Sequence, residues 1–161
     1  KIYRFVSFKV AAEDVEDIVA DIFLKVVQNL GKFKPQPEAS FSSWVYRMAH
    51  NKVVDHYRKM KSVVLDNMTD EDYDGLFESL PDYHVPTVAS KTDQAFLKQN
   101  IAKALNQLNA MQREVLELKF IEDFTNAEVA HIMGKSEGNI RITQMRALKQ
   151  LREIIEMDDS I

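Results

Sequence analysis

The sequence predicts an all-α protein made of two small helical domains joined by a flexible acidic linker. Apolar residues recur at intervals of three and four on both sides of the chain's middle, without convincing strand pairing. Residues 63–92 follow no sustained period and carry one basic against seven acidic residues. The flanking blocks, 1–62 and 93–161, have net charges of +4 and −2. Because so long an irregular run is unusual inside one compact domain, we expect domains at 1–62 and 93–161.

The first domain is expected to contain an amphipathic helix over residues 12–30, which Gly31 is placed to end. Its apolar stripe comprises Val15, Ile18, Val19, Ile22, Phe23, Val26, Val27 and Leu30. The following segment, Lys32–Ser40, holds two prolines and is expected to be a loop, since each proline disfavours helix at the residue before it.

A second helix is expected over Phe41–Lys61, with its polar residues in one stripe because a helix turns about 100° per residue. The stripe consists of Trp44, Arg47, Asn51, Asp55 and Arg58. A stacking ring, two guanidinium groups and an amide suit a nucleic-acid strand. They also suit an ordinary solvated helix face, and Trp44 suits the core, so these alternatives stay open. The core side is expected to hold Val45, Met48, Ala49 and Val53.

The linker 63–92 is expected to hold at most one short helix, around Leu76–Leu80, and the second domain to consist of three or four helices. The first of these is marked by Phe96, Ile101, Leu105 and Leu108, and the next by Val115, Leu116 and Leu118.

The end of the chain has the pattern of a helix-turn-helix. A short helix is expected over Thr125–Met133, with Thr125 and Glu128 as a capping box. Gly134 can take a left-handed turn, and Ser136 can cap a last helix that runs to about Ile155. The buried stripe of that helix is expected to be Ile140, Ala147, Leu148, Leu151 and Ile155. Its other side would offer amides and basic groups to DNA: Asn139, Ile142, Thr143, Arg146, Lys149 and Gln150. A helical hairpin with a polar outer face is the alternative.

The composition argues against most enzymes and against a membrane protein. Glycine occurs only at positions 31, 75, 134 and 138, which excludes a P-loop or a dinucleotide loop. No apolar run approaches the roughly 20 residues of a membrane span, so we expect no membrane insertion and a cytoplasmic protein. The chain has no cysteine, and His50 and His56 lie on different sides of their helix. We therefore expect neither a metal site, a cofactor nor catalytic residues.

Both halves of the chain resemble one family, the sigma factors of RNA polymerase of the sigma-70 class and the extracytoplasmic-function (ECF) type. That family's second conserved region is similar to VEDIVADIFLKVVQNLGKF, and the segment following it to SFSSWVYRMAHNKVVDHYRK. Its fourth region resembles LNQLNAMQREVLELKFIEDFTNAEVAHIMGKSEGNIRITQMRALKQLRE. The resemblance implies that 1–62 is sigma region 2 and 93–161 is sigma region 4.

The resemblance also implies a function and its site residues. Region 2 would dock on the β′ clamp helices of core RNA polymerase through Glu16, Asp17, Asp21 and Lys25. It would recognise and melt the −10 promoter element with Trp44, Arg47, Asn51, Arg58 and Lys59. Region 4 would dock on the β flap and read the −35 element with Ser136, Glu137, Asn139, Arg141, Ile142, Thr143, Arg146 and Lys149. An anti-sigma factor is the further partner that the resemblance implies.

The sequence departs from the family at two places. Ala20 stands where the family usually has glutamine, which removes a polar group from the clamp contact. Ile142, Thr143 and Gln144 replace a stretch that is often Ser-Arg-Leu, so the −35 preference is not carried over. From the residues alone, the acidic groups that open the first helix also suit its dipole. A helix-turn-helix regulator that binds DNA without polymerase, and a simple interaction module, remain the alternative functions.

Overall fold

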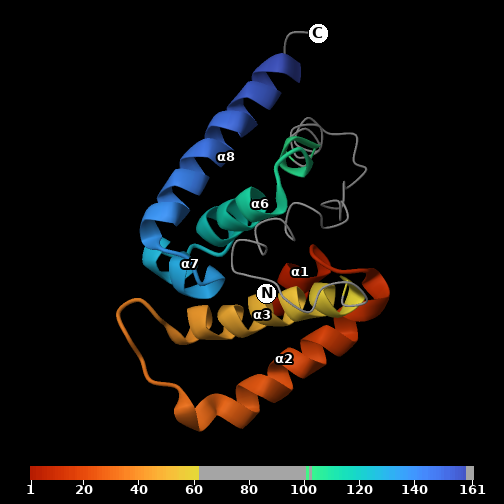
Figure 1. Ribbon diagram of the computed structural model, residues 1–161, viewed down its shortest axis with the longest axis vertical. Coiled ribbons are helices and arrows are strands. Elements are labelled where there is room, and N and C mark those ends of the chain that lie inside the picture. The colour runs from red at the N-terminus through yellow and green to blue at the C-terminus, as the bar shows by residue number, and fades with distance from the viewer. Residues whose placement is uncertain (62–100, 102, 159–161) are drawn as a thin grey trace.

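The computed structural model describes residues 1–61, 101 and 103–158, and every regular element in these ranges is a helix (Figure 1). The prediction of an all-α fold is therefore confirmed for them. Their β pairing is limited to one isolated bridge between Gln36 and Ala39, inside the predicted loop. The expected linker 63–92, its helix at Leu76–Leu80 and the start of the second domain lie outside the described residues.

Three helices form the first group: α1 (Ile2–Ser7), α2 (Val15–Asn29) and α3 (Phe41–Lys61). The predicted helix over residues 12–30 is shorter at both ends. It is preceded by the 3-10 turn η1 (Ala12–Asp14) and followed by another, η2 (Leu30–Lys32), which contains Gly31. The early helix α1 was not expected from the sequence.

Only one side of α2 packs against the rest of the first group. The side that faces α1 and α3 buries Val15, Ile18, Ile22 and Val26, at steps of three, four and four. The broader stripe predicted for this helix is wrong, because Phe23, Val27 and Leu30 are 50%, 69% and 53% exposed. These side chains point away from both neighbouring helices, which leaves an apolar surface on α2.

The second group consists of α6 (Ala110–Leu116), η3 (Glu117–Ile121), α7 (Asn126–Met133) and α8 (Glu137–Asp158), with helical residues before them at 101 and 103–106. The element η3 is a π-helical turn that continues α6, in which the Glu122 amide donates to the Glu117 carbonyl over 3.1 Å.

The end signals predicted for the helix-turn-helix are present. The Thr125 hydroxyl accepts from the Glu128 amide and the Glu128 carboxylate accepts from the Thr125 amide, so the capping box is confirmed. Gly134 ends α7 in the left-handed conformation, with φ 65°. Ser136 accepts from the Asn139 amide over 3.2 Å and caps α8. A second capping box, Asn109 with Gln112, begins α6 and was not predicted.

The last helix buries a narrower stripe than expected. Ile140 and Ala147 are fully buried and Leu151 is half-buried. Leu148 and Ile155 are 40% and 36% exposed, so their assignment to the core is wrong. Ala147 and Leu151 pack with Leu105, Leu108 and Leu116, whereas Leu148 lies farther round the helix. Toward its C-terminal end, α8 extends past α6 (Figure 1).

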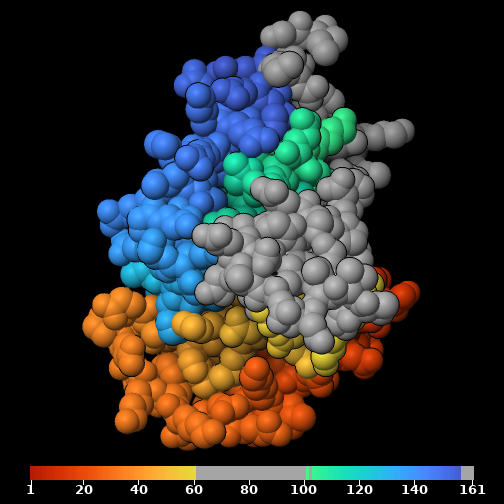
Figure 2. Space-filling view, in the orientation of Figure 1, coloured from red at the N-terminus to blue at the C-terminus, as the bar shows by residue number. Residues whose placement is uncertain are grey.

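The two groups pack on each other through α3 and α7. In Figure 2 the first group, red to yellow, touches the second group, green to blue. One buried apolar cluster contains residues of both groups, and the Tyr46 and Phe124 rings meet edge to face, 5.0 Å apart. This packing was not expected from the sequence.

Candidate DNA-binding and polymerase-binding surfaces

All four residues predicted to contact the polymerase clamp are exposed on α2: Glu16, Asp17, Asp21 and Lys25. Asp21 also accepts a hydrogen bond from the Lys52 ammonium of α3 over 2.5 Å. This hydrogen bond and the charge of Lys52 lower the pKa of Asp21, which keeps its carboxylate ionised. The four side chains therefore form a charged, solvent-facing surface.

An apolar stripe lies on α2, continues to Leu30 in η2 and was not predicted as a site, because the sequence shows it only as part of the apolar pattern of an amphipathic helix. Phe23, Leu24, Val27 and Leu30 are all at least half exposed. A contiguous exposed apolar surface with charged neighbours is typical of a protein-binding site. The signal in the sequence was the width of the apolar pattern, which exceeds what one side of a helix can bury.

The predicted −10 residues on the outer face of α3 differ in their exposure to solvent and in their contacts. Asn51 and Lys59 are exposed. Arg58 is partly exposed, and its guanidinium lies 3.8 Å from the Asp55 carboxylate one turn earlier. All three side chains are at least partly exposed to solvent.

Trp44 is neither a core residue nor a free ring. It is partly buried, and its ring lies 5.2 Å from that of Phe33 and 5.8 Å from that of Phe41. Phe41 is 46% exposed, so this aromatic cluster has a solvent-facing side at the beginning of α3. Such a surface is suited to stacking with a base.

Arg47, the second residue of the stripe, contacts another part of the protein. Its guanidinium donates to the backbone carbonyl of His131 in α7 over 2.9 Å and lies 3.2 Å from Nδ1 of the same residue. For Nδ1 to accept, the neutral ring must carry its proton on Nε2. Burial and the nearby Arg47 charge both lower the pKa of His131, which favours this neutral form.

The outward face of α8 carries the predicted −35 residues. Seven of them are exposed and Thr143 is half-buried; the exposed ones are Ser136, Glu137, Asn139, Arg141, Ile142, Arg146 and Lys149. Contacts within the helix order part of this face, since Arg141 pairs with Glu137 at 2.5 Å and Thr143 donates to Asn139 over 3.2 Å. The helix thus offers amide, guanidinium and apolar groups to solvent, as a DNA-reading helix requires.

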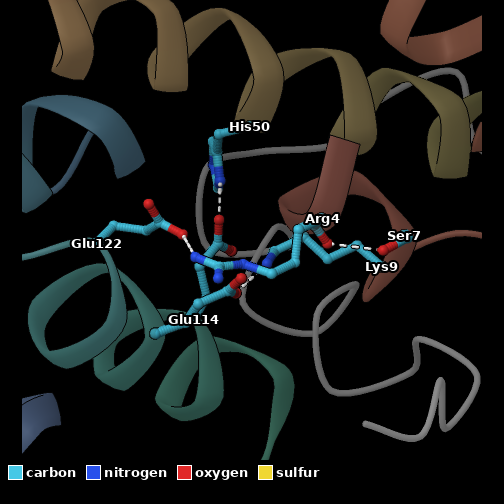
Figure 3. Close-up of polar contacts among 7 residues, drawn as sticks. Arg4, Ser7, Lys9, His50, Glu114 and Glu122 are labelled. Carbon is cyan, nitrogen blue, oxygen red and sulfur yellow. Dashed lines mark hydrogen bonds and ion pairs between the residues drawn. The ribbon is translucent and has the colours of Figure 1, made fainter. Parts of the chain in front are cut away.

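A cluster of ionic pairs lies between the two groups and was not expected from the sequence (Figure 3). The second group supplies Glu114, Glu117 and Glu122, each at most 7% exposed. The first group supplies their nearest partners: His50 to Glu114, Lys9 to Glu117 and Arg4 to Glu122. The His50 ring nitrogen lies 2.9 Å from the Glu114 carboxylate, and Lys1 approaches Glu122 to 3.8 Å.

Burial acts to raise the pKa of all three carboxyl groups. For Glu117 burial prevails, despite the Lys9 charge, and its pKa lies above the usual value. For Glu114 the opposing effects of His50 and Lys9 outweigh burial, and its pKa is lowered. The pKa of Glu122 is also lowered, because Tyr46 and Arg4 outweigh burial.

The histidines considered as metal ligands have separate partners. His50 faces Glu114 between the two groups, whereas Nε2 of His56 lies 3.5 Å from Asp14. The ranges that the structure describes bring no three histidine, aspartate or glutamate side chains into a metal-binding arrangement. Within those ranges, too, each helix is too short or too polar to cross a bilayer.

Two family models match this chain, in the order that the sequence led us to expect. Sigma-70 region 2 matches residues 1–63, and Sigma-70 region 4 matches residues 98–151. Among solved structures, the chain is similar to the sigma factor RpoE of Bartonella quintana in complex with the anti-sigma factor NepR. That likeness has a TM-score of 0.66 at 26% identity and covers 97% of this chain and 91% of the other. CnrH, solved with the cytosolic domain of CnrY, has the same fold (TM-score 0.58, 24% identity, 98% and 79% covered).

Curated relatives agree. The ECF RNA polymerase sigma factor BldN of Streptomyces coelicolor is 29% identical over 98% of this chain, which spans 57% of the length of BldN. The ECF RNA polymerase sigma factor SigF of Caulobacter vibrioides is 31% identical, over 92% of this chain and 75% of SigF. The chain belongs to the ECF family of RNA polymerase sigma factors.

Proposed function

We propose that this chain binds core RNA polymerase, directs it to promoters and helps to melt the −10 element. The observation that carries the proposal is that two separate solvent-facing surfaces suited to DNA, on α3 and α8, occur in one chain with a helix, α2, whose apolar and charged side chains are exposed. A regulator that binds DNA by itself needs only the helix-turn-helix. Both surfaces are used when polymerase holds the chain on two promoter elements.

Polymerase docking is assigned to α2. Its exposed apolar stripe, defined above by Phe23, Leu24, Val27 and Leu30, lies beside the charged residues Glu16, Asp17, Asp21 and Lys25. An apolar centre supplies most of the binding free energy of a protein interface, while charged groups set orientation and association rate. We place the contact with the β′ clamp helices here, and a contact of the second group with the β flap.

Melting is assigned to the outer face of α3. Flipping a base out of the duplex costs a few kcal/mol, and stacking on an aromatic ring contributes about 1–3 kcal/mol per base. The Phe33–Phe41–Trp44 cluster offers such a ring at the beginning of α3. Arg47, Asn51, Arg58 and Lys59 extend along the helix from it and can hold the strand's backbone.

Reading of the −35 element is assigned to α8. Side chains near the N-terminus of a recognition helix reach base edges, and basic groups farther along contact phosphates. We assign base contacts to Asn139, Ile142, Thr143 and Arg146, and backbone contacts to Ser136, Glu137, Arg141 and Lys149. The exposed Ile142 suits apolar contact with a thymine methyl group.

This function implies further properties of the chain. It acts through polymerase and catalyses no reaction itself, and it works in the cytoplasm with the enzyme that it directs. NepR and CnrY are the partners of its structural neighbours. We infer that an anti-sigma factor regulates this chain as well.

In vitro transcription with purified core polymerase tests the proposal. Genomic fragments are transcribed by core enzyme with and without the chain, and the RNA 5′ ends are mapped. We expect specific start sites only when the chain is present. Tight, sequence-specific DNA binding by the chain alone, with no chain-dependent start sites, would instead identify an independent regulator.

A further inference from the structure

The second helical group contacts α3, and one residue in this contact, Arg47, is among those that we assign to −10 DNA. Before the helix begins, the Ser40 hydroxyl contacts the Glu128 carboxylate of α7 over 2.5 Å. Two turns later Arg47 donates to the His131 carbonyl, 2.9 Å away. The next turn contributes His50, which faces Glu114. Contacts with the second group therefore follow α3 from its beginning to its middle.

This packing is incompatible with simultaneous contact with two promoter elements. Arg47 touches His131, and α8 begins only six residues farther on, at Glu137. Six residues span at most about 20 Å, whereas DNA elements two helical turns apart are separated by about 70 Å. The groups must therefore separate before the −10 and −35 surfaces can both be used.

The contact between the groups contains buried ionic groups that favour its reversal. One oxygen each of Glu114, Glu117 and Glu122 is buried without a hydrogen-bond partner among the described residues, as is Nε2 of His131. Buried ion pairs contribute little net stability, because desolvation offsets their attraction. Opening would return these groups to water, while the apolar Tyr46–Phe124 contact favours closure.

We propose that the free chain is autoinhibited: the second group closes on the first, held by the Glu114–His50, Glu117–Lys9 and Glu122–Arg4 pairs, and blocks Arg47. We call these three pairs the clasp. The inhibitory part of the proposal depends on the proposed DNA role of α3, whereas closure itself does not. Because closure is intramolecular, it does not depend on protein concentration, and a partner that binds only the open form must overcome it.

Closure is measured by energy transfer between two dyes. The chain has no cysteine, so the dyes attach only to the thiols introduced by Gln28→Cys on α2 and Met145→Cys on α8. Both positions are exposed. In the otherwise unmodified full-length chain we expect high transfer efficiency, which falls when core polymerase is added. An equally low efficiency with and without polymerase would overturn the proposal.

The clasp variant is Glu114→Gln with Glu117→Gln and Glu122→Gln, which keeps shape and removes three charges. Its control neutralises three exposed carboxylates of the same group: Asp123→Asn, Glu153→Gln and Glu156→Gln. The variant Lys9→Met removes the cationic partner of Glu117, which lies in the first group, and leaves the sequence of the second group unchanged. We expect lower transfer efficiency for the clasp and Lys9→Met variants, with helical circular dichroism retained, and a control like the unmodified chain.

Inhibition is measured by the binding of each protein to single-stranded oligo(dT). If the open form makes up about a tenth of the free chain, opening strengthens binding about tenfold over the control. Arg47→Ala should abolish this gain. Unchanged transfer efficiency in both the clasp and Lys9→Met variants, or opening without any gain in binding over the control, contradicts the proposal. A chain that opens as expected but supports no transcription with core polymerase would contradict the proposed function and leave closure standing.

Discussion

At the scale of single residues, the side chains on the outer face of α3 differ in what they contact. Arg47 is held by α7, Arg58 lies near Asp55, and Asn51 is exposed. The sequence placed them all in one stripe because helix periodicity gives direction only. It cannot say which of them another part of the chain reaches. Substitutions at exposed positions therefore test function with the least disturbance of folding.

Replacing Asn51 and Arg58 together with alanine should impair promoter melting and spare polymerase binding. Exposed substitutions usually change the free energy of unfolding by under about 0.5 kcal/mol each. Permanganate reactivity of unpaired thymines should fall, and a template already mismatched across the −10 element should restore part of it. Gln107→Ala with Arg152→Ala removes the same chemical groups from exposed sites elsewhere and serves as the control. Normal promoter melting by the α3 double variant would show that this stripe is only a solvated helix face without a role in melting.

The protonation of His131 should weaken the fold as pH falls. The folded-state pKa of His131 lies below the usual 6.5. Its contribution to stability is therefore fully present above pH 6.5 and is lost as the pH falls from there through the lower, folded-state pKa. Protonation also places a second charge beside Arg47 and removes the Nδ1 acceptor. The raised pKa of Glu117 acts in the opposite direction, since protonating a buried carboxyl group relieves its desolvation.

A comparison of His131→Gln with the unmodified chain isolates this effect, because Glu117 and every other residue are the same in both proteins. Thermal unfolding between about pH 5 and 7 should show a flatter pH dependence for the variant, which has no imidazole at this site. Parallel curves would mean that His131 does not titrate in this contact.

At the scale of helices, the ends were predicted better than the faces. Thr125, Gly134 and Ser136 act on backbone groups a few residues away, so a short stretch of sequence determines them. Which apolar residues are buried depends on neighbouring helices, and two such assignments failed. Phe23 and Val27 on α2, and Leu148 and Ile155 on α8, are exposed where no described helix covers them.

Glycine substitutions should separate the turn from the helix that follows it. Gly134 has φ 65°, a conformation that costs other residues about 1–2 kcal/mol, so Gly134→Ala should destabilise the protein by about that amount. Gly138 lies within α8, and nothing lies within 4 Å of a Cβ added there. Gly138→Ala should therefore stabilise by about 0.5–1 kcal/mol. Chemical denaturation measures both values, and equal signs would contradict this assignment.

The proposed role of α8 in reading the −35 element can be tested at Arg146. If its guanidinium contacts a base, Arg146→Ala should cost about 1–3 kcal/mol and relax the preference at one position of the −35 element. If it touches only phosphate, binding should weaken alike on all sequences. Holoenzyme binding to a library of −35 variants distinguishes the two. Arg152→Ala, farther along the same helix, is the control, and an unchanged profile for Arg146→Ala would exclude both contacts.

At the scale of the whole molecule, the sequence indicated two groups but not their contact. The two family models and the change in charge along the chain mark the groups separately. Glu114, Glu117 and Glu122 resemble ordinary surface charges of a helix until the positions of Arg4, Lys9 and His50 are known. Pairing between residues more than 60 positions apart leaves no local pattern.

The balanced charge of the molecule predicts weak DNA binding without polymerase. Non-specific affinity for DNA comes mostly from counterions that leave the DNA when basic side chains neutralise its phosphates. A chain with a net charge of −4 releases few of them. The chain alone should therefore bind promoter fragments weakly, and the holoenzyme tightly. Titration by fluorescence anisotropy at two salt concentrations measures both, with core polymerase alone as the reference. Comparable affinity of the free chain and the holoenzyme would contradict this expectation.

The π-helical turn at Glu117–Ile121 makes the number of residues itself part of the interface. Relative to an α-helix it accommodates one additional residue. If the same residues were wound as a regular α-helix instead, everything after them would be rotated by about 100° relative to α6. Glu122 and Phe124 would then face away from Arg4 and Tyr46, although none of these four side chains had changed. Among natural variants, a length difference of one residue in this segment carries information that a count of conserved contact residues would miss.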